Sequence, residues 1–253
     1  MAQLRLIARL DIKGPNLIKA IQLEGVRKLG DPQEFARRYY QNGIDEILYM
    51  DAVASLYDRE MFAQIVERTA EEVFIPLTVG GGIRSINDVR SILRAGADKV
   101  AINSTSTHRP ELITEVAETF GSQCMVLSID AKRNGKDGWE AYRDGGREHT
   151  DLDTVEWAVR GQELGAGEIL LTSVDKEGTR KGFDLELVQA VSDAVTIPVI
   201  ASGGMGKLDD LTKVVKDGHA DAVAMAHVLH YDTLLLSDIR EHAKAEGLSV
   251  RNL

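Results

Sequence analysis

Cysteine, proline and aromatic residues are scarce in this chain of 253 residues, and it contains no long apolar run. The single cysteine, Cys124, excludes an intrachain disulfide, and its apolar surroundings predict a small buried hydrophobe. No segment approaches the roughly 20 apolar residues that a membrane helix needs. The N-terminal residues lack the apolar region of a signal peptide. We therefore expect a cytoplasmic protein with no membrane partner.

Basic residues are also in the minority, since 30 Lys and Arg face 40 Asp and Glu and leave a net charge of −10. An acidic chain without a basic stripe is not expected to bind nucleic acid. An anionic substrate stays compatible with this charge if local dipoles outweigh it. No motif typical of metal ligation or dinucleotide binding is present, so we expect neither a metal nor an organic cofactor.

The sequence does contain an internal repeat of about 120 residues. The segment 7–13, which ends in Asp11-Ile-Lys, is similar to the segment 126–132, which ends in Asp130-Ala-Lys. The glycine pair 81–82 returns as the pair 203–204. A repeat of this length indicates a duplicated supersecondary block. We interpret the chain as one domain made of two halves, at about 1–122 and 123–253.

Short β-branched apolar runs alternate with amphipathic segments along the whole chain. This alternation is typical of a parallel sheet with a helix after each strand. An open doubly wound sheet alternates in the same way, but eight units arranged as two halves favour a closed (β/α)8 barrel, whose usual length is roughly 250 residues. The strands are expected near 5–11, 46–51, 76–80, 98–103, 124–130, 168–173, 198–202 and 221–226. The helices are expected near 31–42, 57–72, 86–95, 109–120, 152–164, 184–194, 208–217 and 231–245.

Two of the expected connections are longer than the usual two to six residues. Residues 14–30 follow the first strand, contain Lys19 and are interpreted as a lid over the barrel. Residues 133–150 follow the fifth strand and contain Asn134-Gly135 and Gly145-Gly146, which predict a small hairpin beside the site.

Glycine pairs follow the third and the seventh strand, at Gly81-Gly82 and Gly203-Gly204. Exposed backbone N–H groups near a helix start attract anions, and the loop after the seventh strand of such barrels is a recurrent phosphate site. Simple tight turns would explain one such pair, but two pairs at symmetric positions predict two phosphate cradles and a long bisphosphate ligand. The other residues that we expect to bind the substrate are Lys19, Asn103, Ser104, Thr172, Gly178, Ser202 and His227.

Asp11 and Asp130 end the first and fifth strands, which face each other across an eight-stranded barrel. A carboxylate at the end of an apolar strand is costly to bury unless it is paired or functional. Opposed carboxylates suit a general acid and a general base. The alternative is that each forms a structural ion pair with a nearby lysine. We predict a catalytic pair, with Asp51 in a supporting role.

Charged residues also mark the opposite end of the barrel. Arg5, Glu46, Lys99 and Glu168 lie at or near the starts of four strands. The alternating signs are typical of a solvated ring, and a gate into the barrel interior is the alternative interpretation.

These features together resemble one family, the cyclase subunit of imidazole glycerol phosphate synthase (the HisF family). The resemblance runs from about Arg5 to the C-terminus. It is carried by the motifs Leu10-Asp-Ile-Lys, Thr78-Val-Gly-Gly-Gly-Ile, Ile129-Asp-Ala-Lys-Arg, Gly165-Ala-Gly-Glu-Ile-Leu-Leu-Thr-Ser and Ile200-Ala-Ser-Gly-Gly.

The resemblance implies a lyase of histidine biosynthesis. A partner glutaminase would dock at the N-terminal face, and its ammonia would pass the charged ring at Arg5. The ammonia would then react with a ribulosyl bisphosphate at the other end, giving imidazole glycerol phosphate and an aminoimidazole carboxamide ribotide. Asp11 and Asp130 would be the acid/base pair, and Lys19 would help to hold the substrate.

The chain departs from the family pattern around the first two strands and in one cradle. The family usually has Cys where Arg9 stands, Thr at Val53 and Ser at His227, and the lid segment 14–25 differs as well. Such changes are similar to those of paralogues that serve the amidation of surface sugars, so a second hypothesis is ammonia delivery to another acceptor. A third is a scaffold without activity, which the retention of Asp11 and Asp130 argues against.

Overall fold

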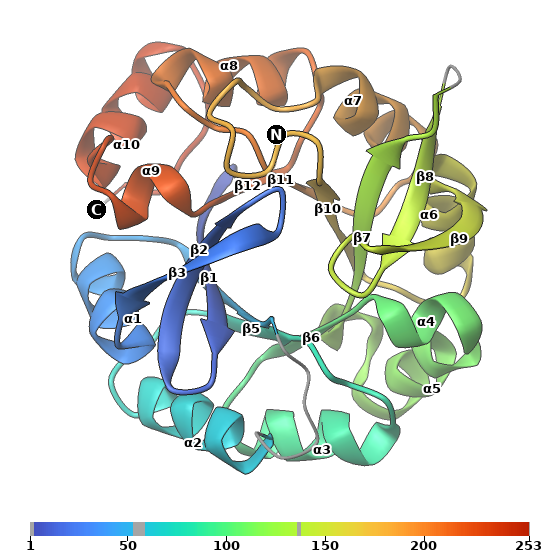
Figure 1. The fold of residues 1–253 in the computed structure, drawn as a ribbon. Coiled ribbons are helices and arrows are strands. Elements are labelled where there is room, and N and C mark those ends of the chain that lie inside the picture. The colour runs from blue at the N-terminus through green and yellow to red at the C-terminus, as the bar shows by residue number, and fades with distance from the viewer. Residues whose placement is uncertain (1–2, 53–58, 136–137, 253) are drawn as a thin grey trace.

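The computed structural model describes residues 3–52, 59–135 and 138–252, so Val53 lies outside the described residues. Eight parallel strands close into a barrel in the order β10-β11-β12-β1-β4-β5-β6-β7, and β7 pairs back with β10. Figure 1 shows this ring and the helices around it. The expected (β/α)8 barrel is therefore confirmed. Its strands are β1 (Arg5–Lys13), β4 (Glu46–Asp51), β5 (Leu77–Gly80), β6 (Lys99–Ile102), β7 (Met125–Arg133), β10 (Glu168–Ser173), β11 (Val199–Ser202) and β12 (Ala222–Met225).

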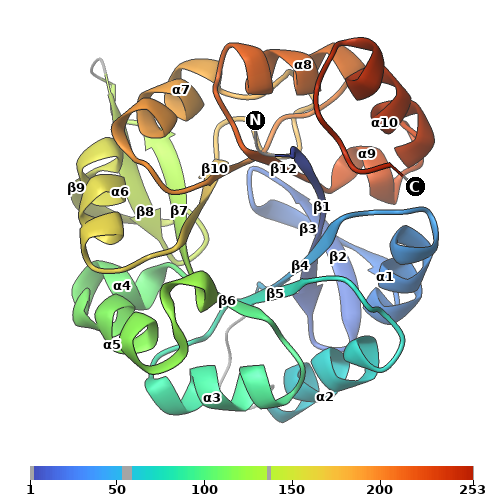
Figure 2. The same cartoon turned by 180° about the vertical axis from the view of Figure 1, so that it is seen from behind.

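A layer of helices covers the outside of the barrel, as the view from behind also shows (Figure 2). Asp31 illustrates how such a helix begins: its carboxylate accepts a hydrogen bond from the Gln33 N–H, and Pro32 occupies the first helical position. The outer helices are α1 (Pro32–Gln41), α2 (Arg59–Ala70), α3 (Ile86–Arg94), α5 (Glu111–Phe120), α6 (Thr154–Glu163), α7 (Leu185–Ala194), α8 (Leu208–Lys216) and α10 (Leu236–Ala245).

Three short helical segments were not expected. α4 (Ser104–His108) and α9 (His227–His230) follow β6 and β12, and the 3-10 turn η1 (Ser122–Cys124) precedes β7. Their lengths, five residues or fewer, leave no room for the amphipathic periodicity by which a helix is recognised in sequence. Cys124 is half-buried at the end of η1 rather than buried.

Both long connections are antiparallel hairpins. β2 (Asn16–Ile21) pairs with β1 and with β3 (Glu24–Gly30), so the expected lid is a two-stranded ribbon that continues β1. β8 (Trp139–Arg143) pairs with β7 and with β9 (Glu148–Asp153). The second hairpin was predicted from its turn glycines. Both hairpins stand at the same end of the barrel (Figure 1).

Strand β1 shows how the sequence sorts residues between the two sides of the barrel wall. Leu6, Ala8 and Leu10 join the large core between barrel and helices, whereas Ile7 belongs to a separate cluster inside the barrel. Successive side chains of a strand point to opposite faces, so Arg9 and Asp11 share the interior face with Ile7. The inner cluster consists of Ile7, Leu48, Ala101, Val126, Leu170, Ile200, Ala222 and Ala224.

Aspartates just before the strands tie the N-terminal end of the barrel together. The Asp98 carboxylate accepts a hydrogen bond from the backbone N–H of Leu77 at 2.8 Å. Asp221 accepts one from Val199 at 2.9 Å. The equivalent bonds explain why an Ala-Asp pair recurs in the two halves of the sequence, and they assign these aspartates a structural role.

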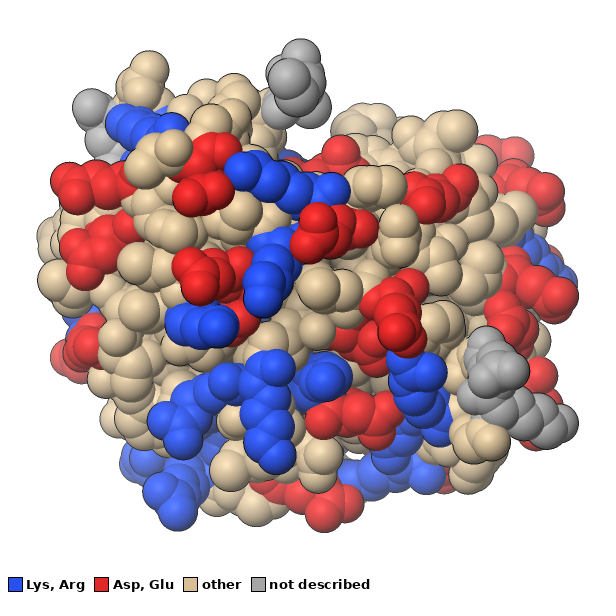
Figure 3. All heavy atoms as spheres, turned by 90° about the horizontal axis from the view of Figure 1, so that it is seen from above, with Lys and Arg blue, Asp and Glu red and all other residues tan. Residues whose placement is uncertain are grey.

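Acidic and basic side chains alternate over the helical face that includes α7 and α8, and basic side chains gather along one edge of it (Figure 3). Among the described residues, none of the helices combines the length and apolar character that a membrane span requires.

Candidate functional site

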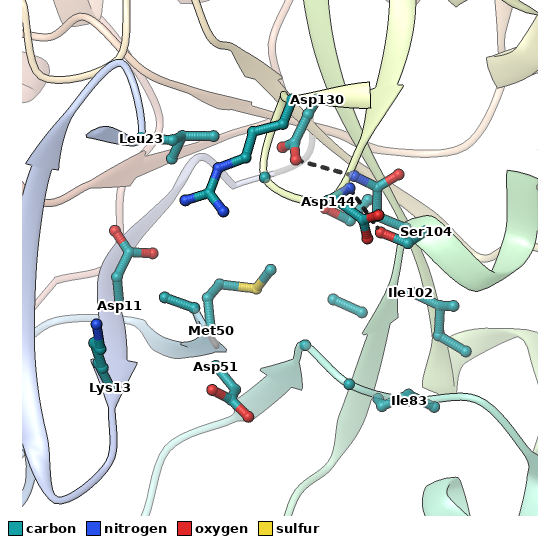
Figure 4. A pocket seen from close by; sticks show the side chains of 18 of the residues that line it. Asp11, Lys13, Leu23, Met50, Asp51, Ile83, Ile102, Ser104, Asp130 and Asp144 are labelled. Carbon is teal, nitrogen blue, oxygen red and sulfur yellow. Dashed lines mark hydrogen bonds between the residues drawn. The ribbon is translucent and has the colours of Figure 1, made fainter. Parts of the chain in front are cut away.

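A cavity of about 430 Å³ opens at the C-terminal ends of the barrel strands. Side chains from β1, β4, β6 and β7 and from both hairpins surround it (Figure 4). A cavity of this size and position is the usual location of the site in such barrels. The lining includes Arg9, Asp11, Asp51, Gly81, Gly82, Asn103, Ser104, Asp130 and Asp144.

Asp11 and Asp130 reach this cavity from β1 and β7, which stand four places apart in a ring of eight strands. Both are nearly fully buried, at 6% and 9% exposure. Figure 4 shows the two carboxylates on different sides of the cavity. The barrel thus brings the two predicted residues to one site, although 118 residues lie between them in the sequence.

The two carboxyl groups have opposite pKa shifts. Burial raises the pKa of Asp130 to about 6, and this effect exceeds the opposing influence of Arg9 and of the Asn103 side chain. Burial acts on Asp11 in the same direction, but the adjacent Arg9 guanidinium, together with Lys19, outweighs it, and the pKa of Asp11 lies below its usual value. Asn103 Nδ2 donates to Asp130 Oδ2 at 3.0 Å. A pair whose pKa values are driven apart is suited to acid and base roles.

Arg9 is buried inside the barrel and reaches from β1 to side chains on β10 and β11. Its Nε donates to Asp11 Oδ1 at 3.0 Å. Its Nη1 donates to Thr172 Oγ1 and to Ser202 Oγ, each at 3.0 Å. Sequence reasoning missed this residue as part of the site. The signal was present, because a charge two positions before Asp11 in an apolar strand must share its face.

Lys19 lies on β2, and its ammonium is paired with the Glu177 carboxylate; both side chains are buried. The backbone N–H of Gln22 also donates to the Glu177 carbonyl at 2.9 Å. Gly178 packs so closely below the hairpin that a Cβ there would lie 2.7 Å from the Ala20 carbonyl. The lid is thus seated on the β10–α7 loop, and Glu177 is a second residue whose position the sequence did not predict.

The first predicted cradle faces the open cavity. Gly81 and Gly82 have φ values of +95° and +67°, which favour glycine, and both line the cavity with Asn103 and Ser104. Close packing also demands glycine here, because a Cβ on Gly81 would lie 2.3 Å from the Asp51 carbonyl. Ser104 Oγ accepts a hydrogen bond from the Asp144 N–H at 3.0 Å, which ties the cradle to the β8–β9 turn.

The second predicted cradle is nearly closed. Ser202, Gly203, Gly204, Gly178 and His227 line a cavity of only about 20 Å³. A void of this size holds about one water molecule. Thr172 lies nearby, fully buried, with its hydroxyl bonded to Arg9. Burial, followed by the nearby cations Arg180 and Lys19, lowers the pKa of His227, so its imidazole is neutral at pH 7.

A closed ring of ion pairs occupies the other end of the barrel interior. Arg5 contacts both Glu46 and Glu168. Lys99 Nζ lies 3.0 Å from Glu46 Oε1 and 2.9 Å from Glu168 Oε2. The two glutamates are buried, whereas Arg5 and Lys99 are partly exposed. The four predicted residues therefore form one connected cluster rather than separate solvated side chains.

The fold and this site define a (β/α)8-barrel enzyme with opposed carboxylates and paired glycine turns at the C-terminal ends of its strands. The sequence profile of the family described as "Histidine biosynthesis protein" matches residues 5–234. Imidazole glycerol phosphate synthase subunit HisF of Legionella pneumophila is 63% identical over 210 residues, which cover 83% of this chain and 99% of that protein. The chain belongs to the HisF family of histidine biosynthesis, and it is a cyclase-type lyase. The resemblance found in the sequence is thereby confirmed.

Proposed function

We propose that this chain converts a ribulosyl bisphosphate intermediate into imidazole glycerol phosphate and an aminoimidazole carboxamide ribotide, using ammonia from a partner glutaminase. The observation that carries the proposal is the pair of opposed carboxylates with pKa values shifted in opposite directions. Near neutral pH the lowered pKa keeps Asp11 ionised, ready to accept a proton. Asp130, with a pKa of about 6, is the group that can hold one.

The barrel interior supports a route for ammonia from the N-terminal face. Above the ring of Arg5, Glu46, Lys99 and Glu168, the interior is lined by an apolar cluster that includes Ala101, Ala222 and Ala224. Neutral ammonia crosses apolar surroundings at lower cost than ammonium, because no charge loses its water. In this proposal the ion-pair ring is the gate and the glutaminase docks around it.

The first cradle supports binding of one phosphate end of the substrate. Gly81 and Gly82 carry no side chain between their backbone and the cavity, and the Asn103 amide and Ser104 hydroxyl stand beside them. In this proposal the second phosphate binds at Gly203 and Gly204. Binding of the second phosphate requires the lid to move away from the β10–α7 loop. This movement separates Lys19 from Glu177 and leaves Lys19 free to contact the substrate.

The direct test is turnover of the histidine-pathway bisphosphate by this chain alone, at high ammonium concentration and alkaline pH. Formation of both products, dependent on ammonium and lost in Asp11→Asn and Asp130→Asn, is the expected result. Absence of turnover by the folded protein would contradict the proposal. Adding a glutaminase and glutamine in place of ammonium then tests the partner separately.

One observation favours a second candidate, an ammonia-using reaction on a different acceptor such as a sugar in surface polysaccharide synthesis. Arg9 already holds the hydroxyls of Thr172 and Ser202, and the second cradle has room for about one water. An acceptor with a single anionic group would need only the first cradle.

Calorimetric titration with inorganic phosphate separates the two candidates. A bisphosphate enzyme is expected to bind two phosphates per chain, one of which is lost in Gly204→Ala. A single site, lost in Gly82→Val and unaffected by Gly204→Ala, would favour the second candidate.

A further inference from the structure

Arg9 is a buried cation inside the barrel, and it directly contacts one member of the carboxylate pair. Its side chain is 6% exposed and that of Asp11 is 9% exposed. The two residues are separated by one position on β1, so the strand itself directs both side chains to the interior. The contact is made by Nε to Oδ1 alone.

The remaining hydrogen bonds of the guanidinium hold it in place. Thr172 on β10 and Ser202 on β11 both accept from Nη1. Because the guanidinium is planar, two acceptors on one nitrogen fix the direction in which Nε points. The hydroxyls of two other strands therefore orient Arg9, and Arg9 orients Asp11.

The other charged groups near Asp11 do not replace this contact. Lys19 on β2 also lowers the pKa of Asp11, but less than Arg9 does, and its ammonium is paired with Glu177 from the β10–α7 loop. His230 on α9 is held neutral near pH 7, since its burial lowers its pKa to about 3. Asp11 and Glu177 both raise the pKa of Asp130, so the negative charges around the pair favour a proton on Asp130. Within the described residues, Arg9 is the one cation in direct contact with Asp11.

We propose that Arg9 is a positioning residue that assigns the roles within the carboxylate pair. It keeps Asp11 as the carboxylate in one rotamer, so that Asp11 starts each turnover as the base and Asp130 as the acid. Arg9 itself exchanges no proton, because a guanidinium stays protonated in proteins. The assignment of catalytic roles rests on the proposed function, whereas the charge state of Asp11 can be measured without it.

A matched pair of variants separates positioning from simple structural support. Arg9→Met keeps an unbranched side chain but removes the cation. Arg240→Met is the control, because Arg240 forms an equally short pair with Asp45 at 3.0 Å and with similar burial, 5% and 9%, at the other end of the barrel. Both variants break a buried ion pair, but only the first touches Asp11.

The first readout is ammonia-dependent kcat against pH. In Arg9→Met the pKa of Asp11 should rise by about one to three units, which moves the acidic fall in rate to higher pH by the same amount. The rate at the optimum should fall by roughly 10²-fold, the usual size of an acid/base contribution. Arg240→Met should keep the pH profile of the original protein, and Arg9→Lys should restore most of it.

The second readout needs no turnover: the ¹³C carboxyl resonance of Asp11, identified by its loss in Asp11→Asn, is followed against pH. An unchanged Asp11 titration in Arg9→Met, with a loss of stability equal to that of Arg240→Met, would overturn the proposal. A shifted titration in a protein without histidine-pathway turnover would contradict the proposed function and leave the role of Arg9 intact. If Arg9→Met does not fold, Arg9→Gln is read by the same two criteria.

Discussion

The free energy of unfolding should change in opposite directions when the two opposed aspartates, Asp11 and Asp130, are each replaced by asparagine. The pKa of Asp130 is raised from 3.8 to about 6 in the folded protein, a difference of about 2.2 units. Each unit corresponds to 1.36 kcal/mol, so ionised Asp130 costs the folded state about 3 kcal/mol at pH 8. Asparagine has nearly the same shape and can still accept the hydrogen bond from Asn103. Asp130→Asn should therefore raise the free energy of unfolding at pH 8 by about 2–3 kcal/mol.

The gain from Asp130→Asn should depend on pH with a definite sign. A carboxyl whose folded pKa is raised contributes stability that is present below the unfolded pKa and is lost as the pH rises through the folded value of about 6. At pH 4 the Asp130 carboxyl is already protonated in the folded state, so the variant should gain only about 0.6 kcal/mol there. Asp11→Asn should instead destabilise at pH 8 by about 3–5 kcal/mol, because it leaves Arg9 buried without its partner.

Urea denaturation at pH 8 and at pH 4, followed by circular dichroism, measures all of these differences. Ammonia-dependent turnover should be lost in both variants, so only Asp130→Asn should combine a higher stability at pH 8 with a loss of activity. If Asp130→Asn lowered the stability at pH 8, or if its gain were the same at both pH values, the assignment of Asp130 as a strained, functional carboxyl would be refuted.

Three further changes test other parts of the structure. Below pH 6.5 the unfolded chain binds a proton at His230, whereas the folded chain binds it only near pH 3, so acidification from pH 6.5 to 5 lowers the free energy of unfolding by about 2 kcal/mol. In His230→Phe, urea denaturation should show a loss of stability over that range that is smaller by this amount. An equal loss in the variant and the original protein would contradict the burial argument. Glu177→Gln removes the charge that holds Lys19, so amide hydrogen exchange in β2 should become at least tenfold faster, whereas unchanged exchange would mean that backbone contacts alone seat the lid. Gly204→Ala places a Cβ 2.2 Å from the Gly182 carbonyl at a φ of +112°, so thermal unfolding should show a lower Tm and inorganic phosphate should bind more weakly; unchanged phosphate affinity would remove this turn from the site.

The sequence alone determined the barrel and the residues at its open end. Strand and helix periodicity are local properties, and parallel strands place the residues after them at one end. For this reason the sequence places Asp11, Asp130 and the glycine pairs 81–82 and 203–204 at the same end of the barrel. The β8–β9 hairpin followed in the same way from its turn residues.

Only the tertiary structure decided which side chains pair with one another. The partner of Lys19 is Glu177, 158 residues away, and the hydroxyls that hold Arg9 come from β10 and β11. These pairings depend on barrel closure and on how far each side chain reaches, and neither produces a periodic pattern in the sequence. The same holds for the charges at Arg5 and Lys99, which form one closed ring because the strands bring their first residues together around a single axis.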